Sequence, residues 1–138
     1  MGVLQEIVDQ ANSKSTAQTA NALAGKFALS QTIVKEQTNM DNLPRCGIHL
    51  GPIDASEDHQ DSPHGCTQNM DVEIKCWVIG EHSDMFELIK DANRAILGIQ
   101  PDDYVTELIL GSGFMKEING NKAFYELSYH FDSQTKSE

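Results

Sequence analysis

The second half of the chain follows a strand, helix, strand, strand order, and turn residues separate the elements. The first strand is predicted at 72–79, the helix at 83–97, and the last two strands at 105–110 and 122–131. A helix enclosed by strands in this way must pack on one face of the sheet they form. The order predicts a single α+β domain over 1–138, with an antiparallel-rich mixed β-sheet packed by one or two α-helices.

The helix at 83–97 has the clearest amphipathic pattern. Its apolar positions recur every three or four residues and predict a buried stripe: Met85, Leu88, Ile89, Ala92, Ala95 and Ile96. Ser83 or Asp84 is placed to cap it, with Glu87 at capping-box spacing from Asp84. Gly98 is placed to end it.

The last two strands show alternation and a hairpin signal. In 122–131 one face is apolar and aromatic, whereas 105–110 alternates less strictly. Gly111-Ser-Gly113 interrupts the earlier strand, and 114–118 is a candidate extension past a bulge. Asn119-Gly120-Asn121 is typical of a hairpin turn.

The first half is less regular. Residues 3–11 have the spacing of an amphipathic helix, and 17–27 resumes a weaker, alanine-rich helical pattern. A short strand is possible at 32–36. Leu43-Pro44 then leads into a strand at 45–51 with one buried face.

Residues 52–71 and 132–138 are polar, and the sequence predicts a long acidic loop and a polar C-terminal tail. The acidic run of the loop is either a solvated segment or an interface that meets basic side chains of a neighbouring subunit. Its members are Asp54, Glu57, Asp58 and Asp61, and the candidate partners are Lys35, Lys116 and Lys122.

The predicted core combines the buried faces of these elements. It contains Ile48, Leu50, Val72, Ile74, Cys76, Ile89, Ile96, Ile109, Tyr125, Leu127 and Tyr129. Cys46 and Cys76 fall among apolar strand residues, where a free cysteine acts as a small hydrophobe.

Composition excludes several function classes. The formal net charge is −11, from 21 acidic and 10 basic residues, so the chain lacks the basic footprint of a nucleic-acid binder. No apolar run approaches the roughly 18 residues of a membrane span. The N-terminus lacks the features of a signal peptide, and we expect a protein made in the cytoplasm.

The cluster His59, His64 and Cys66, flanked by Asp58 and Asp61, holds the only candidate metal ligands that the sequence suggests. The signal is weak, because structural zinc sites usually offer closely spaced ligand pairs at both ends. A His64–Cys66 nucleophilic pair matches no peptidase signature, and no phosphate-binding motif is present. We therefore expect a protein that is not an enzyme, with no catalytic residues and no cofactor.

The layout resembles the tail terminator (tail completion) proteins of tailed bacteriophages, such as the minor tail protein U of lambda-like phages. The resemblance covers 43–132 and loosely the N-terminal helix. It rests on Leu43-Pro44 before the strand 45–51, the acidic loop 52–71, the strand at Val72, the helix 83–97 and the aromatic alternation Phe124–Phe131. The stretch 15–36 is longer and richer in alanine than in the family.

The resemblance implies a structural protein of the virion, assembled in the host cytoplasm. Such proteins form a ring, usually of six subunits, on the head-proximal end of the tail tube. The ring stops tube growth and contacts the neck or head-closure protein, or the sheath terminus if the tail is contractile. DNA passes through it without specific binding. The candidate contact residues are the acidic run, Phe114, Lys116 and Glu117.

Two alternatives stay open at this point. The first is another structural role, as a neck, head-closure or tube-related protein. The second is a small metal-binding or hydrolytic domain that uses His59, His64 and Cys66.

Overall fold

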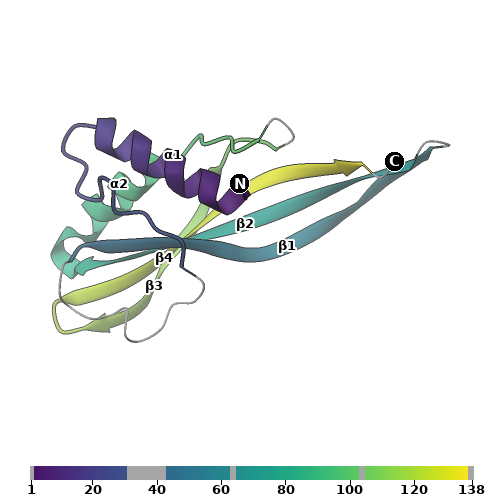
Figure 1. The fold of residues 1–138 in the computed structure, drawn as a ribbon. Helices are drawn as coiled ribbons and strands as arrows, with labels where there is room; N and C mark the ends of the chain where they lie inside the picture. The colour runs from purple at the N-terminus through teal and green to yellow at the C-terminus, as the bar shows by residue number, and fades with distance from the viewer. Residues whose placement is uncertain (1, 31–42, 63–64, 103–104, 137–138) are drawn as a thin grey trace.

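The computed structural model describes residues 2–30, 43–62, 65–102 and 105–136, with side chains described except at 56–67 and 136 (Figure 1). The strand expected at 32–36 lies outside these residues. The helices are α1 (Val3–Ala17), the 3-10 helix η2 (His82–Asp84) and α2 (Met85–Ile96). The strands are β1 (Arg45–Ser62), β2 (Gly65–Glu81), β3 (Ile109–Asn119) and β4 (Lys122–Lys136).

The four strands form one sheet in the order β1-β2-β4-β3, and every neighbouring pair is antiparallel. The predicted α+β class is confirmed. A parallel contact occurs as an isolated bridge between Leu29 and Ile48, at the outer edge of β1. Figure 1 shows α1 and α2 together on one face of the sheet.

The main core lies between this face and the two helices. Ile7, Val8 and Ala11 of α1 are buried, as are five positions of α2: Met85, Leu88, Ala92, Ala95 and Ile96. The predicted stripe of α2 is therefore confirmed, except that Ile89 is partly buried. Asp84 occupies the N-cap position, as predicted, but its side chain makes no capping hydrogen bond.

Two predicted core residues are on the surface. Leu50 is 46% exposed and Ile109 is 61% exposed, and Tyr125 is partly buried. Leu50 and Ile109 belong to β1 and β3, the two outermost strands of the sheet. The alternation of apolar residues distinguished one side of each strand. It did not reveal that the strand lies at an edge of the sheet, where neighbouring side chains only partly bury that side.

The predicted second helix at 17–27 does not form. The chain leaves α1 at Ala17 and makes a series of turns, with positive φ at Ala20 and Gly25. Polar residues within α1 hold these turns. Asn12 exchanges two hydrogen bonds with the backbone of Phe27, at 2.8 and 2.9 Å, and the buried Ser15 hydroxyl accepts one from the Gly25 amide.

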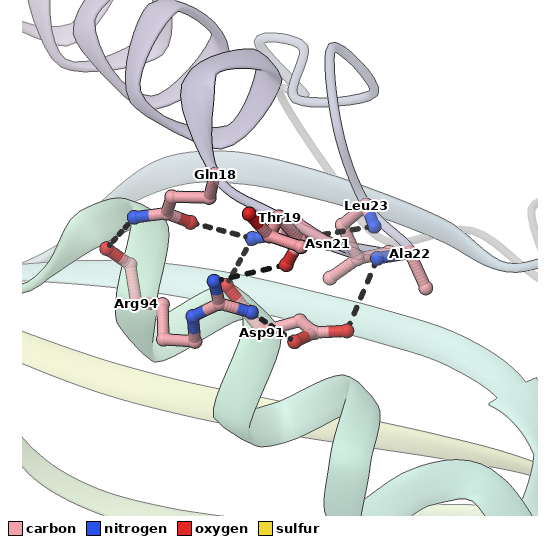
Figure 2. Close-up of polar contacts among 7 residues, drawn as sticks. All are labelled: Gln18, Thr19, Asn21, Ala22, Leu23, Asp91 and Arg94. Carbon is pink, nitrogen blue, oxygen red and sulfur yellow. Dashed lines mark hydrogen bonds and ion pairs between the residues drawn. The ribbon is translucent and has the colours of Figure 1, made fainter.

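The same turns are attached to α2 (Figure 2). The Gln18 amide donates to the Arg94 carbonyl at 2.8 Å, and the Asn21 amide donates to the Asp91 carbonyl at 3.0 Å. The Asp91 carboxylate accepts from the Ala22 amide. Side chains of the turn and of α2 thus replace the intrahelical hydrogen bonds that a second helix would have supplied.

The predicted loop 52–71 is wrong. Residues 52–62 continue β1 and residues 65–71 begin β2, with the two strands paired antiparallel, and β4 pairs with β2 as far as Thr67 and Lys136. We call this three-stranded extension (52–62, 65–71 and 132–136) the arm. Figure 1 shows it projecting beyond the helices. The arm has no helix to pack on, so its strands carry no apolar alternation and resemble a loop in the sequence.

The C-terminal half needs two further corrections. The predicted tail 132–138 is strand through Lys136, and the strand expected at 105–110 begins at Ile109 and continues to Asn119. Val105 makes only an isolated bridge to Ser133. The predicted bulge is confirmed by a register shift between Leu110 and Ser112, and the hairpin turns at Gly120, where φ is +61°.

A second, smaller cluster lies on the face of the sheet opposite the helices. It consists of Trp77, Ile79 and Phe124, with Leu43 packed against it. The Trp77 and Phe124 rings are stacked with centroids 6.4 Å apart. Gly47, the cross-strand partner of Trp77, leaves the space that the indole occupies, because a Cβ there would overlap the ring.

We predict that Gly47→Ala lowers the free energy of unfolding by about 1–3 kcal/mol, because the buried Trp77 ring must move. Urea unfolding followed by Trp77 fluorescence measures the loss. Gly113→Ala is the comparison: its Cβ would meet only the end of the Leu127 side chain, so a smaller loss is expected. Equal losses would contradict the proposed packing.

Candidate interaction surface

β3 is an edge strand with no covering layer. It pairs with β4 on one side only, and all eleven of its residues are exposed. The backbone groups on its other side have no strand partner among the described residues. An edge of this kind is a template for pairing with another chain.

β3 also carries large apolar side chains in water. Five of them are between 38% and 61% exposed: Ile109, Leu110, Phe114, Met115 and Ile118. Scattered apolar residues are ordinary on a protein surface, but several along one free edge mark an interaction site. Two register shifts and the charges of Lys116 and Glu117 limit how a partner can pair here.

Three predicted contact residues, Phe114, Lys116 and Glu117, all lie on this edge and are exposed. The Lys116 ammonium lies 4.7 Å from the centre of the Phe114 ring and 3.6 Å from the Glu126 carboxylate of β4. These contacts hold the Lys116 side chain against the sheet face, beside the free edge.

A polar network supports this edge from within the sheet. The Glu126 side chain is only 8% exposed and lies between two lysines, with Lys75 at 3.6 Å on its other side. Lys75 pairs in turn with Glu73 at 3.1 Å and donates to the Ser128 hydroxyl at 3.0 Å. A buried carboxylate with two cationic neighbours fixes the arrangement of side chains next to β3.

Two groups in this network have shifted pKa values. Burial would raise the pKa of Glu73, but hydrogen bonds from Ser128 and Lys75 and the nearby positive charges lower it overall. Burial lowers the pKa of His49, and the Lys75 charge adds to this while the Glu126 charge opposes it. His49 Nδ1 is buried without a hydrogen-bond partner.

The opposite edge of the sheet is β1. Ile48 exchanges backbone hydrogen bonds with Ala28 and Ser30, both at 2.9 Å, so this stretch covers the edge at one point. From Leu50 onward β1 has no strand neighbour on that side among the described residues. Leu29, Leu50 and Ile53 are each about half exposed there.

The arm brings carboxylates into register. Asp54 and Asp132 are both Cα partners of Asp71, so three aspartates stand in a row across β1, β2 and β4. Like charges directly opposite each other destabilise a sheet. The other predicted acidic contacts, Glu57, Asp58 and Asp61, lie on β1 of the arm, but their side chains are outside the described set.

The metal candidates are not tested. The side chains of His59 and Cys66 lie outside the described set, and so does His64 altogether. Among the side chains that are described, no three of His, Cys, Asp or Glu are grouped to hold a metal ion. The metal-binding and hydrolytic alternative stays a prediction. None of the described helices is long and apolar enough to cross a membrane.

Comparison with known proteins gives a fold. No protein-family model matches this chain, and no curated protein matches it. Among solved structures, a chain from the virion of a native gene transfer agent particle is similar over 97% of this chain and 98% of its own, with a TM-score of 0.55 and 12% identity.

The type 4 fimbrial biogenesis protein PilO from Pseudomonas aeruginosa gives a TM-score of 0.30 at 8% identity, over 99% of this chain and 68% of its own, and that value is too low to support an argument. The likeness to the virion chain shows that the two share a fold.

We predict that acidification below about pH 6.5 destabilises the protein in part through His49. Because its pKa is lower in the folded state, the unfolded chain binds the proton more readily and stability falls as pH decreases. His49→Gln should reduce the slope of unfolding free energy against pH between 5 and 7. Equal slopes in wild type and His49→Gln would contradict this.

Proposed function

We propose that this protein is a structural, non-enzymatic subunit of a phage-like particle. In this proposal it forms a ring of six subunits that caps the head-proximal end of the tail tube. The ring stops tube growth and connects the tail to the neck or head-closure protein. The likeness of fold to a virion chain of a gene transfer agent particle supports the more general part of this proposal, that the chain is a virion protein.

The observation that carries the ring is the uncovered β3 edge. A chain that stayed monomeric would be expected to protect an eleven-residue edge strand, and this one exposes large apolar side chains along it. A second apolar edge lies on the opposite side of the sheet, along β1. Two different surfaces on opposite sides suit a head-to-tail contact, which closes into a ring when the rotation per subunit divides a full turn.

Termination then follows from geometry alone. One face of the ring would match the growing end of the tube, and the other would not offer the surface that the next tube subunit needs. No bond is made or broken, which agrees with the absence of a catalytic signature in the sequence. The net charge of −11 also suits a conduit, because like charge repels the DNA backbone.

The nearest alternative is that the protein is a neck or head-closure protein. It would use the same ring and the same edges but would leave tube length unaffected. The two roles therefore predict different tube lengths when the ring is prevented from forming.

We predict that the purified protein forms a closed oligomer at raised concentration and that Ile109→Lys/Ile118→Lys leaves it monomeric. Both side chains are about half exposed or more, so the folded monomer should tolerate lysine, whereas a paired edge would have to bury two charges. Native mass spectrometry gives the number of subunits.

Val3→Lys/Phe86→Lys is the matched control, since both residues are exposed apolar side chains on the helices. It should assemble as the wild type does. A wild-type protein that is monomeric at every concentration would overturn the ring, and so would equal loss of assembly in the control.

In cells that produce the particles, we predict that the Ile109→Lys/Ile118→Lys protein gives tubes of uncontrolled length, because no ring caps them. Electron microscopy of the particles measures the length distribution. Normal tubes that fail to join heads would instead favour the neck or head-closure role.

A further inference from the structure

We infer that β3 of one copy pairs, as an antiparallel strand, with β1 of the next copy from Leu50 onward. The sheet then continues from subunit to subunit around the ring. The inference rests on the proposed function in one respect only, that the protein self-assembles. It adds which edge meets which, and it names a second copy of this chain as the occupant of both edges.

The available backbone defines where pairing is possible. Hydrogen bonds from Ile48 to Ala28 and Ser30 occupy the edge of β1 at its start. Beyond that point β1 continues to Ser62 with no strand beside it among the described residues. This free stretch of β1 is comparable in length with β3, which runs from Ile109 to Asn119.

Leu50 and Ile53 of β1 and three of the five apolar side chains of β3 fall on the same side of the sheet, whereas Ile109 and Phe114, opposite His130 and Glu126, fall on the other. Leu50 and Ile53 pair with Ile74 and Val72, whose side chains belong to the core under the helices. Leu110, Met115 and Ile118 pair with core residues of β4, which places them on that same face: Tyr129, Tyr125 and Ala123. Joining the edges therefore extends the helix-side core across the contact.

Charge also favours this pairing. Lys116 lies at the free edge of β3, with its side chain 43% exposed. Asp54 is exposed on the arm of β1, in a row with Asp71 and Asp132. A neighbouring lysine would relieve the repulsion within that row, so each copy supplies what the other's edge lacks.

Strand direction is consistent as well. Three successive antiparallel steps separate β1 from β3, so the two run in opposite directions. In a ring whose axis is inclined to the strands, β1 of the next copy lies antiparallel to β3. Because the free part of β1 is its arm half, neighbouring copies are staggered along the strands, and a closed sheet requires such a stagger.

The competing arrangement is a twofold β3–β3 contact. It is also antiparallel, but it leaves Leu50, Ile53 and the aspartate row of the arm without a partner. It gives a closed dimer and no ring. The two arrangements predict different behaviour when one edge at a time is blocked.

The experiment uses two full-length variants. The first blocks β3 with Ile109→Lys/Ile118→Lys, and the second blocks β1 with Leu50→Lys/Ile53→Lys. Each variant is measured alone and in a 1:1 mixture by native mass spectrometry and sedimentation, with circular dichroism and melting temperature to establish that both are folded.

If β3 meets β1, each variant alone is monomeric, and the mixture forms a dimer of one copy of each, because one intact edge of each kind remains. The dimer should hold at protein concentrations at least tenfold below those at which either variant alone self-associates. Val3→Lys/Phe86→Lys in place of either variant should instead restore larger assemblies.

Two results overturn the inference. In the first, the β1-blocked variant dimerises by itself, which means that β3 meets β3. In the second, both folded variants stay monomeric in the mixture although the wild type assembles, which means that the ring uses other surfaces. A wild type that never assembles is a different failure, because it refutes the proposed ring itself.

Discussion

The structure depends on one unequal packing arrangement, an antiparallel sheet whose helices cover one face over part of its length. Where the helices lie, the strands bury Ile74, Cys76, Leu127 and Tyr129, and the core is closed. Past the helices the same strands continue as an arm, from which Met70 packs against the core. At the sides, β3 and the outer part of β1 have no further strand beside them in the described part of the chain, and they carry half-exposed apolar side chains. A single subunit thus closes its core at the centre of the sheet and leaves apolar side chains exposed at its edges, and the proposed assembly would cover them.

The sequence predicted the elements covered by helices better than it predicted the uncovered arm and edges. Where a residue is buried on one side only, period and alternation are strong, so the stripe of α2 and the alternation of β4 located those elements correctly. Where both faces of a strand are exposed to solvent, the sequence shows no apolar alternation. The arm reads as a polar loop because Asp54, Asp71 and Asp132 have the composition of solvated turns, although backbone pairing alone makes these segments strands. The prediction of a second helix at 17–27 failed for another reason. Alanine favours a helix locally, but Asn12 and Asp91 form hydrogen bonds with residues far away in the sequence, and no local pattern contains these.

The candidate surface was predictable only in part. Phe114, Lys116 and Glu117 were predicted as contact residues on a candidate strand extension past a bulge, and the structure places them together on β3. Ile109 and Leu50 were assigned to the core, and their exposure is what makes the edges informative. Strand order decides exposure at an edge, and strand order arises from pairings between residues far apart in the chain. The buried Glu126 is a further case, because its two lysine partners come from different strands, β2 and β3.

The difference between the two edges bears on how assembly ends. A sheet whose two edges were alike would pair by a twofold axis and stop at two copies. Here the β3 edge presents apolar residues with Lys116 and Glu117, and the β1 edge presents apolar residues with Asp54, so the two edges are unlike. A head-to-tail contact between unlike edges uses up both edges only if the chain of copies closes. In the proposed closed ring, β3 and the outer part of β1 cover each other, whereas residues 132–136 of β4 still lie at an edge, next to the isolated bridge between Val105 and Ser133. Contacts with a tube or a neck would then use the two ends of the ring, its faces or this remaining edge of the arm.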